Sequence, residues 1–437
     1  MFGTSGIRGR VGEDVTAALA LEIGRALGSE GYDRVVIGRD SRDSGSMLLD
    51  AIAAGLCECG ADALEIKGEI AATPTIARAV GWADADAGVV VTASHNPPED
   101  NGIKLWTPSG KAFGPDRRAA IVERVESEAV DSAAWDETGD RTTLSGATES
   151  HASAIRSSVN LREPLSVVVD VGNGAGQITA TVLEQLGCTV RTLNAQPDGS
   201  FPGRPSEPTA ETLESLETLV GGSDADLGVA HDGDADRMMA VDETGTFVPK
   251  DSLLALFARE EVGDGDRVAA PVDTSLAVED ALAARGGSLV RTKVGDVFVA
   301  QRATDADVVF GGEPSGAWIW PEETLCPDGP LAAAKLVELV AASGPLSSLE
   351  SEIDSYPIRR GAIESDDKSR RMDDVERRVL ETYDDVDNRD GVRVETEDGW
   401  FLLRASGTQP IIRVTAQARE SGRAAQLYEE ATELVGE

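Results

Sequence analysis

The chain has 437 residues, of which 78 are acidic and 40 are basic, so its formal net charge is −38. This charge excludes unassisted binding to nucleic acids or anionic membranes, because such binding depends on cations that displace counterions from phosphates. Only seven of the basic residues are lysine. The excess of acid and the shortage of lysine predict adaptation to a salty cytoplasm, because self-repulsion at this charge destabilises a compact chain at low ionic strength.

Length and a hydrophobic content of 41% predict roughly two to four globular domains. The four cysteines lack the CxxC spacing and the chain has only three histidines, which argues against a structural zinc site. The opening residues contain no apolar targeting segment, and no stretch approaches the length of uninterrupted apolar sequence that spans a membrane. We therefore expect a soluble, cytoplasmic protein.

A similar pattern occurs three times, beginning at Arg34, Ser166 and Arg267. Each copy has an apolar run, a polar loop, a stretch with helical periodicity, a glycine and a second apolar run, which is the pattern of a βαβ unit. The segment 368–437 mixes helical and alternating strand patterns and indicates a small α+β domain. We predict three similar α/β domains followed by an α+β domain, with the ranges 1–150, 151–250, 251–355 and 356–437.

A serine follows the predicted strand from Gly88 to Thr92, within the segment TASHNPPEDNGIK. In open α/β sheets ligands bind beyond the carboxyl ends of strands, so Ser94 stands where a nucleophile would stand, with His95 beside it. A serine turn at the end of a strand explains the same residues without any chemistry.

Three aspartates, Asp232, Asp234 and Asp236, follow another apolar run. Carboxylates at every second position of an extended loop point to one side, and three of them suit Mg²⁺. A calcium loop is excluded because its sixth position requires glycine and is Arg237 here. A solvated acidic turn is the alternative in so acidic a chain.

Two further loops carry polar groups that suit a ligand. Glu313 and Ser315 lie in a glycine-rich loop after a predicted strand and suit sugar hydroxyls, although tight turns need the same glycines. A turn between two later strands combines arginines, hydroxyls and a glycine, as a phosphate-binding loop does, although a plain surface loop is the alternative. Its residues are Arg404, Ser406, Gly407, Thr408 and Arg413, and the N-terminal segment with Thr4, Ser5, Arg8 and Arg10 has the same character.

These groups occur in successive predicted domains, and together they indicate phosphoryl chemistry on a phosphorylated polyol, enclosed by a mobile last domain. A metal-dependent phosphatase is a competing function, but it would need no second phosphate-binding loop. A non-catalytic sugar-phosphate-binding module is another, but it would need no metal loop.

The motifs TASHNP and DGDADR, with the other two loops in the same order across nearly the whole chain, resemble those of the α-D-phosphohexomutases. That family includes phosphoglucomutase, phosphomannomutase and phosphoglucosamine mutase. The resemblance implies three α/β domains with mixed sheets and a C-terminal domain related to the TATA-binding-protein fold, arranged round a central cleft. It also implies an isomerase that interconverts hexose 6-phosphate and hexose 1-phosphate through a phosphoserine and a hexose 1,6-bisphosphate, with one Mg²⁺ per chain.

The same resemblance gives the candidate residues their roles. Ser94 becomes the phosphoserine and, through its phosphate, a ligand of the Mg²⁺ that the three aspartates hold. Arg8 and Lys104 act near the reacting oxygens as acid/base or charge-stabilising groups, while His95 and Arg237 contact the phosphoserine. The remaining residues bind substrate: Glu313 and Ser315 bind the sugar hydroxyls, and Arg404, Ser406, Gly407, Thr408 and Arg413 bind the non-reacting phosphate.

The choice of sugar rests on finer similarities. The segments RTKVGDVFV (291–299), FGTSGIRG and RASGTQPIIR resemble the phosphoglucosamine mutase branch, and they favour glucosamine phosphates over glucose or mannose phosphates. Ala317 stands where many members place a histidine, which leaves the contact to the sugar 2-position open. We expect small sugar phosphates as partners, without nucleic acid or membrane, and the sequence leaves the oligomeric state open. The acidic composition adds the expectation of a halophilic archaeal source.

Overall fold

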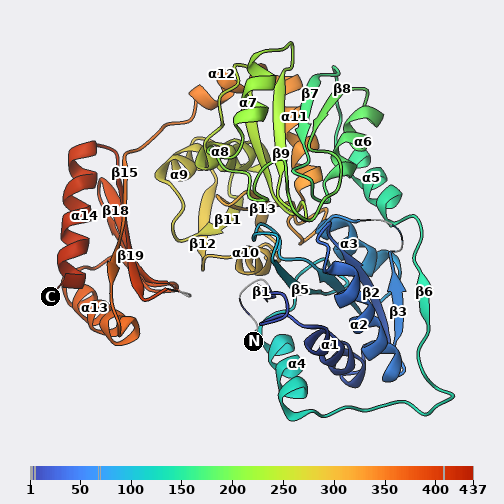
Figure 1. The fold of residues 1–437 in the computed structure, drawn as a ribbon. Coiled ribbons are helices and arrows are strands. Elements are labelled where there is room, and N and C mark those ends of the chain that lie inside the picture. Colours follow the sequence, from blue (N-terminus) through green and yellow to red (C-terminus); the bar gives the residue numbers. More distant parts are fainter. Residues whose placement is uncertain (1–2, 4–5, 67, 69, 407–408, 437) are drawn as a thin grey trace. The chain divides into compact units, whose positions relative to one another are not determined.

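The computed structural model describes all residues except 1–2, 4–5, 67, 69, 407–408 and 437 (Figure 1). These residues form two units: residues 1–250 with 315–350 make the first, and residues 251–314 with 351–437 make the second. Among the described residues, no helix is both long enough and apolar enough to cross a membrane.

The first unit begins with a mixed six-stranded sheet in the order β1-β5-β4-β2-β3-β6. The central strands β2, β3 and β4 run parallel, β6 continues this direction at one edge, and β5 and β1 pair antiparallel at the other. The strands are β1 (Ile7–Arg10), β2 (Arg34–Arg39), β3 (Asp62–Glu65), β4 (Ala87–Val91), β5 (Asp100–Trp106) and β6 (Arg141–Thr143).

Helices cover both faces of this sheet because its apolar side chains alternate between the two faces. Val35 and Ile37 of β2 belong to the core on the side of α1, α2 and α4, whereas Val36 belongs to the core on the side of α3. The helices are α1 (Ala17–Ser29), α2 (Gly45–Glu58), α3 (Thr73–Trp82), α4 (Pro115–Ser127) and α5 (Ala147–Ser158).

The first unit continues with a four-stranded sheet in the order β10-β9-β7-β8. The strands β7, β8 and β9 are parallel and β10 is antiparallel to β9, so this sheet is also mixed. Its strands are β7 (Ser166–Asp170), β8 (Thr189–Leu193), β9 (Leu227–His231) and β10 (Met238–Asp242). The unit also contains α6 (Gln177–Gln185), α7 (Glu214–Gly221), β14 (Ala317–Ile319), α11 (Gly329–Ser343) and most of α12 (Leu346–Ser351).

The second unit joins the third α/β segment to the C-terminal domain. The parallel strands β11 (Arg267–Pro271), β12 (Ser288–Thr292) and β13 (Val308–Glu313) belong to the α/β segment, with α8 (Lys250–Glu261), α9 (Leu276–Ala283) and α10 (Asp296–Arg302). The C-terminal sheet is antiparallel in the order β15-β19-β18-β17-β16. Its strands are β15 (Ile358–Glu364), β16 (Val386–Asp387), β17 (Val392–Thr396), β18 (Gly399–Ala405) and β19 (Ile411–Ala418).

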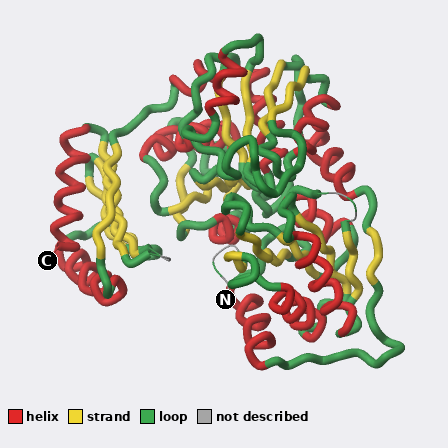
Figure 2. The backbone as a smooth tube through the Cα atoms, in the orientation of Figure 1, coloured by secondary structure: helices red, strands yellow, loops and turns green. Residues whose placement is uncertain are grey.

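Two helices, α13 (Lys368–Thr382) and α14 (Ser421–Gly436), pack on one face of the C-terminal sheet (Figure 2). On the opposite face, Trp400 and Leu402 pack against Val272 and Leu276 of the α/β segment. The predicted fold class, α/β units with mixed sheets followed by an α+β domain, is confirmed.

The helices α1 and α2 approach each other through glycines at their crossing. A Cβ atom at Gly24 would lie 2.3 Å from the Ile52 carbonyl oxygen, and a Cβ atom at Gly55 would lie 2.3 Å from the Leu21 carbonyl oxygen. Backbone occupies the space that any side chain would need, so both positions require glycine.

Gly55→Ala is therefore expected to lower the melting temperature, because overpacking of about 1–3 kcal/mol outweighs the usual gain from replacing a helical glycine. The matched control is Gly422→Ala in α14, where a Cβ atom would meet nothing within 4 Å and the substitution should stabilise. Thermal unfolding followed by circular dichroism in high salt measures both. A Gly55→Ala protein as stable as the parent would show that the two helices can separate at no cost.

Candidate active site

Ser94 is fully buried in the loop that follows β4, and its backbone is in the left-handed region with φ of +53°. The turn is closed by Thr92, whose hydroxyl accepts from the Ser94 amide at 2.8 Å and donates to Asp40 at 2.6 Å. Because the Thr92 hydroxyl satisfies the Ser94 amide, the Ser94 hydroxyl can bond to another residue. It donates to Asp232 at 2.6 Å, across 138 residues of sequence.

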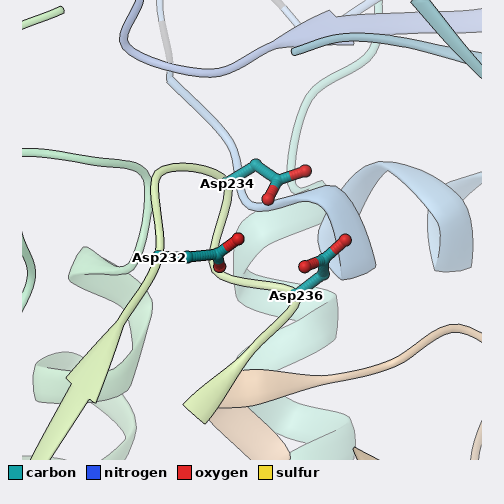
Figure 3. Close-up of side chains that lie close together, drawn as sticks. All are labelled: Asp232, Asp234 and Asp236. Carbon is teal, nitrogen blue, oxygen red and sulfur yellow. The ribbon is translucent and has the colours of Figure 1, made fainter. Parts of the chain in front are cut away.

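The three aspartates lie in the loop between β9 and β10, and all are buried. One carboxylate oxygen from each lies within 4.8 Å of those of the other two. Figure 3 shows the three side chains converging on a common space. The alternating spacing in the sequence is thus realised as a convergent group, and the alternative of a solvated acidic turn is wrong.

The negative charges in this group act strongly on one another because water is excluded. Burial, followed by the charges of Asp236 and Asp234, raises the pKa of Asp232 well above its ordinary value. Lys104 offsets part of this charge, since its Nζ lies 2.7 Å from Asp234 and 2.5 Å from Asp236. Burial opposes charge on Lys104, but the two carboxylates raise its pKa above the ordinary value.

A divalent cation fits this group. One ammonium cannot neutralise three carboxylates, and Asp234 Oδ1 is buried with no hydrogen-bond partner. A buried acceptor without a partner costs on the order of 1–3 kcal/mol, and a metal ion would satisfy it. The available donors are all carboxylate oxygens, which suit Mg²⁺ with phosphate or water in the remaining positions.

Thr73, at the start of α3, holds the metal loop from outside. Its hydroxyl donates to Asp234 Oδ2 at 2.6 Å and its amide donates to the Asp234 carbonyl at 2.9 Å. These bonds orient the carboxylate whose other oxygen has no partner. The sequence analysis missed Thr73, because it is 161 residues from Asp234 and resembles an ordinary residue at the start of a helix.

The two histidines in the motifs differ in role. His231 Nδ1 donates to the Arg237 carbonyl and its Nε2 accepts from Thr179, each at 2.8 Å, so this ring ties together the two ends of the metal loop. Burial lowers its pKa to about 4, which keeps it neutral. His95 Nδ1 lies 3.4 Å from Ser94 Oγ. Burial, then the charges of Arg237, Arg8 and Lys104, lowers the pKa of His95 to about 2.

Further cationic and hydroxyl groups in the first unit belong to the same site. Arg8 lies on β1 opposite Gly102 of the strand that carries Lys104, and its Nε is buried with no hydrogen-bond partner. The Arg237 amide donates to Asp232 at 3.2 Å.

The loop with Ser315 joins the metal loop, because the Met238 amide donates to the Gly316 carbonyl at 3.0 Å. Ser315 Oγ is buried without a partner and is available to a ligand.

The remaining predicted residues lie in the second unit. Glu313 ends β13, as the sequence pattern indicates. Arg404 and Arg413 face each other directly in the β18–β19 pair, where two like charges destabilise the pairing unless an anion joins them. Arg404 has a partial counterion in Asp390, 3.3 Å away. The Ser406 amide donates to the Ile411 carbonyl. Gly407 and Thr408, like Thr4 and Ser5, lie outside the described residues.

The structure thus brings one group of predicted residues together in the first unit, and in the second unit it pairs Arg404 with Arg413. The first group is Arg8, Ser94, His95, Lys104, Asp232, Asp234, Asp236 and Arg237.

Comparison with known proteins covers nearly the whole chain. Models of the phosphoglucomutase/phosphomannomutase alpha/beta/alpha domains I, II and III match residues 1–131, 148–245 and 249–356. The model of the C-terminal domain matches residues 363–434. The chain belongs to the phosphoglucomutase/phosphomannomutase family. This member of the family is therefore an isomerase that transfers a phosphoryl group, and the prediction from TASHNP and DGDADR is confirmed.

The relatives and solved structures agree with this membership. The enzyme is 47% identical to a probable phosphoglucosamine mutase of Methanopyrus kandleri, over 99% of this chain and 97% of that protein. It is 46% identical to another from Methanosarcina acetivorans, over 100% of this chain and 99% of that protein. A family protein from Burkholderia thailandensis has the same fold, with a TM-score of 0.88, 27% identity and coverage of 100% and 97%. The family uses Mg²⁺, in agreement with the carboxylate group described above.

Thr73→Val is expected to weaken Mg²⁺ binding by about 10- to 100-fold, because it removes the hydroxyl that orients Asp234. The matched control is Thr75→Val, in the same helix, whose hydroxyl bonds to His151 at 2.8 Å. Calorimetric titration with Mg²⁺ compares both variants with the parent. Equal affinity in all three proteins would show that Asp234 is oriented without Thr73.

Proposed function

We propose that the enzyme interconverts glucosamine 6-phosphate and glucosamine 1-phosphate, with Ser94 as the carrier of the transferred phosphoryl group. One observation above all supports this reaction. The buried Ser94 hydroxyl lies 2.6 Å from Asp232, which is one of a group of three carboxylates. A hydroxyl in this position can carry a phosphate whose oxygen reaches the cation that the carboxylates hold.

The phosphate on Ser94 would be stabilised by the surrounding positive charge. Mg²⁺ held by Asp232, Asp234 and Asp236 would neutralise negative charge on the transferred group. The partnerless Nε of Arg8 is placed to donate to a phosphate oxygen, and His95, neutral and beside Ser94, can donate a single hydrogen bond.

Lys104 acts by charge rather than as a base. A general base must lose its proton near the working pH, whereas the pKa of Lys104 is raised above its ordinary value by Asp234 and Asp236. Its ammonium therefore stabilises the negative charge that spreads over the phosphoryl oxygens during transfer.

Each turnover contains two transfers. In the first, the bond between phosphorus and Ser94 Oγ breaks as phosphorus bonds to the free hydroxyl oxygen of the hexose monophosphate, and the proton of that hydroxyl passes to Ser94 Oγ. The product is a hexose 1,6-bisphosphate. After this intermediate turns round, its other phosphoryl group returns to Ser94. Arg404 and Arg413 face each other across the paired strands β18 and β19. Together with Ser406, they hold the phosphate that is not reacting.

Glu313 and Ser315 bind the sugar hydroxyls in this proposal, and Gly407 and Thr408 complete the phosphate-binding loop. Glucosamine is the preferred sugar because relatives that match along their whole length, at 41–47% identity, are named probable phosphoglucosamine mutases. Mannose and glucose phosphates are the alternatives, in keeping with the wider family. The cytoplasmic location stays a prediction.

Phosphorus NMR tests this proposal directly. The purified protein, in high salt with Mg²⁺ and a trace of glucose 1,6-bisphosphate, receives glucosamine, glucose and mannose phosphates in turn. We expect interconversion of the 6- and 1-phosphates with little inorganic phosphate, fastest for glucosamine. Ser94→Ala should abolish it, because no oxygen remains to carry the phosphoryl group.

Four results would contradict parts of the proposal. Accumulation of inorganic phosphate alone would indicate a phosphatase. Faster turnover of mannose or glucose phosphates would replace the assignment of the sugar. Full activity of Ser94→Ala would remove Ser94 from the mechanism, and binding without turnover in the parent would indicate a sugar-phosphate-binding protein.

A further inference from the structure

Arg42 lies between β2 and α2, in the polar loop of the first repeated pattern and outside the four ligand-binding motifs, and its side chain is fully buried. The guanidinium spans the loop that carries Ser94. Its Nη2 donates to the carbonyls of Ser94 at 2.9 Å and Asn96 at 2.6 Å. Its Nη1 donates to the carbonyls of Pro97 at 2.6 Å and Asp100 at 2.8 Å.

This loop has little support from secondary structure. Residues 92–99 belong to no helix or strand, so their carbonyl groups have no place in a strand ladder. Arg42 supplies a partner to the carbonyls of Ser94, Asn96 and Pro97 in this loop, and to that of Asp100 at the start of β5. Ser94 is buried, and a buried carbonyl needs such a partner. One side chain thereby fixes the path of the loop from Ser94 to Asp100.

The buried guanidinium of Arg42 needs a counterion, and Asp40 supplies it. Burial of an unpaired charge costs several kcal/mol. Asp40 pairs with Arg42 Nε at 3.2 Å, and the same carboxylate accepts from Thr92, which in turn holds the Ser94 amide. Ser94 sits at positive φ, which persists only where the surroundings enforce it. Arg42 holds the Ser94 carbonyl, and Asp40 holds Thr92, which bonds to the Ser94 amide.

The segment between β8 and α7 also supports the loop. The guanidinium of Arg42 stacks over the ring of Phe201 at 5.0 Å, and the Ser206 hydroxyl donates to the Asn96 carbonyl at 3.0 Å. A buried arginine supports the metal loop in a similar way. Arg204 pairs with Asp170 at 2.7 Å and donates to the His231 carbonyl at 2.6 Å. Each of the two loops is thus held by a buried arginine, the Ser94 loop by Arg42 and the metal loop by Arg204.

We propose that Arg42 is a positioning residue for phosphoryl transfer. It holds the carbonyls of the Ser94 loop so that Ser94 Oγ stays against Asp232 and the metal group, and Ser206 adds a smaller contribution at Asn96. Arg42 reaches the reacting atoms only through this loop, so its loss should slow transfer more than it weakens substrate binding. The inference rests on the proposed function of Ser94.

Arg42→Lys tests this role because lysine keeps the charge beside Asp40 but cannot bond to four carbonyls in two directions. The matched control is Arg78→Lys. Arg78 is similarly buried, pairs with Asp328 at 2.9 Å and donates to the Glu323 carbonyl, but makes no contact with the Ser94 loop. The measurements are kcat and KM for the sugar phosphate, the melting temperature, and the phosphorus NMR shift of phosphorylated Ser94.

We expect kcat of Arg42→Lys to fall on the order of 100-fold, because a displacement of Ser94 Oγ by about 1 Å would lower the rate by about this factor. KM should change less than about threefold, which is the pattern of an interaction used in the transition state. The phosphoserine resonance should shift, while Arg78→Lys keeps the parent's kcat and resonance. A folded Arg42→Lys with the parent's kcat and resonance would overturn the proposal.

Ser206→Ala keeps the test decisive if Arg42→Lys does not fold, because it removes a single hydroxyl from the same support. A severalfold lower kcat with unchanged KM would support the positioning of the loop, and unchanged kcat would overturn it. The parent protein separates this inference from the proposed function. No interconversion by the parent contradicts the function, whereas turnover by the parent with unaffected variants contradicts only the positioning role.

Discussion

Mutual repulsion among three buried carboxylates is the constraint on which the rest of the site depends. Asp232, Asp234 and Asp236 share a small space, and burial, followed by the charges of the other two aspartates, raises the pKa of Asp232. The chain offsets only part of this charge, chiefly through Lys104. A divalent cation held by these carboxylates would supply the rest, and a phosphate that binds this cation would lie beside them. Ser94 is held at that place by its bond to Asp232.

The repeated architecture puts the polar loop at the same place in each α/β segment. In each α/β segment the reactive loop follows a strand: Ser94 comes after β4, Asp232 after β9, and Glu313 at the end of β13. Polar loops at the ends of strands are where open α/β sheets bind ligands. Because each loop is a short polar interruption after an apolar run, the sequence alone predicts these positions and the α/β class of the fold.

The residues that support these loops were not predictable in the same way. Thr73, Arg42 and Ser206 act through bonds to loops 161, 52 to 58 and 110 residues away, and the distance in sequence hides the contact. A buried arginine also looks like a surface arginine in a sequence, since its burial depends on tertiary packing. Sugar selection is harder still, because Ala317 brings only a methyl group to a position where the family often has a polar ring.

The central claim is that Ser94 alternates between a free hydroxyl and a phosphate during turnover. Mixing the dephosphorylated protein with hexose 1,6-bisphosphate labelled in both phosphates, followed by rapid quenching and peptide mapping, tests it most directly. The account predicts label on Ser94 at up to one phosphate per chain, and transfer of that label to sugar when glucosamine 6-phosphate is added. Label on another residue, or its release only as inorganic phosphate, would contradict the account.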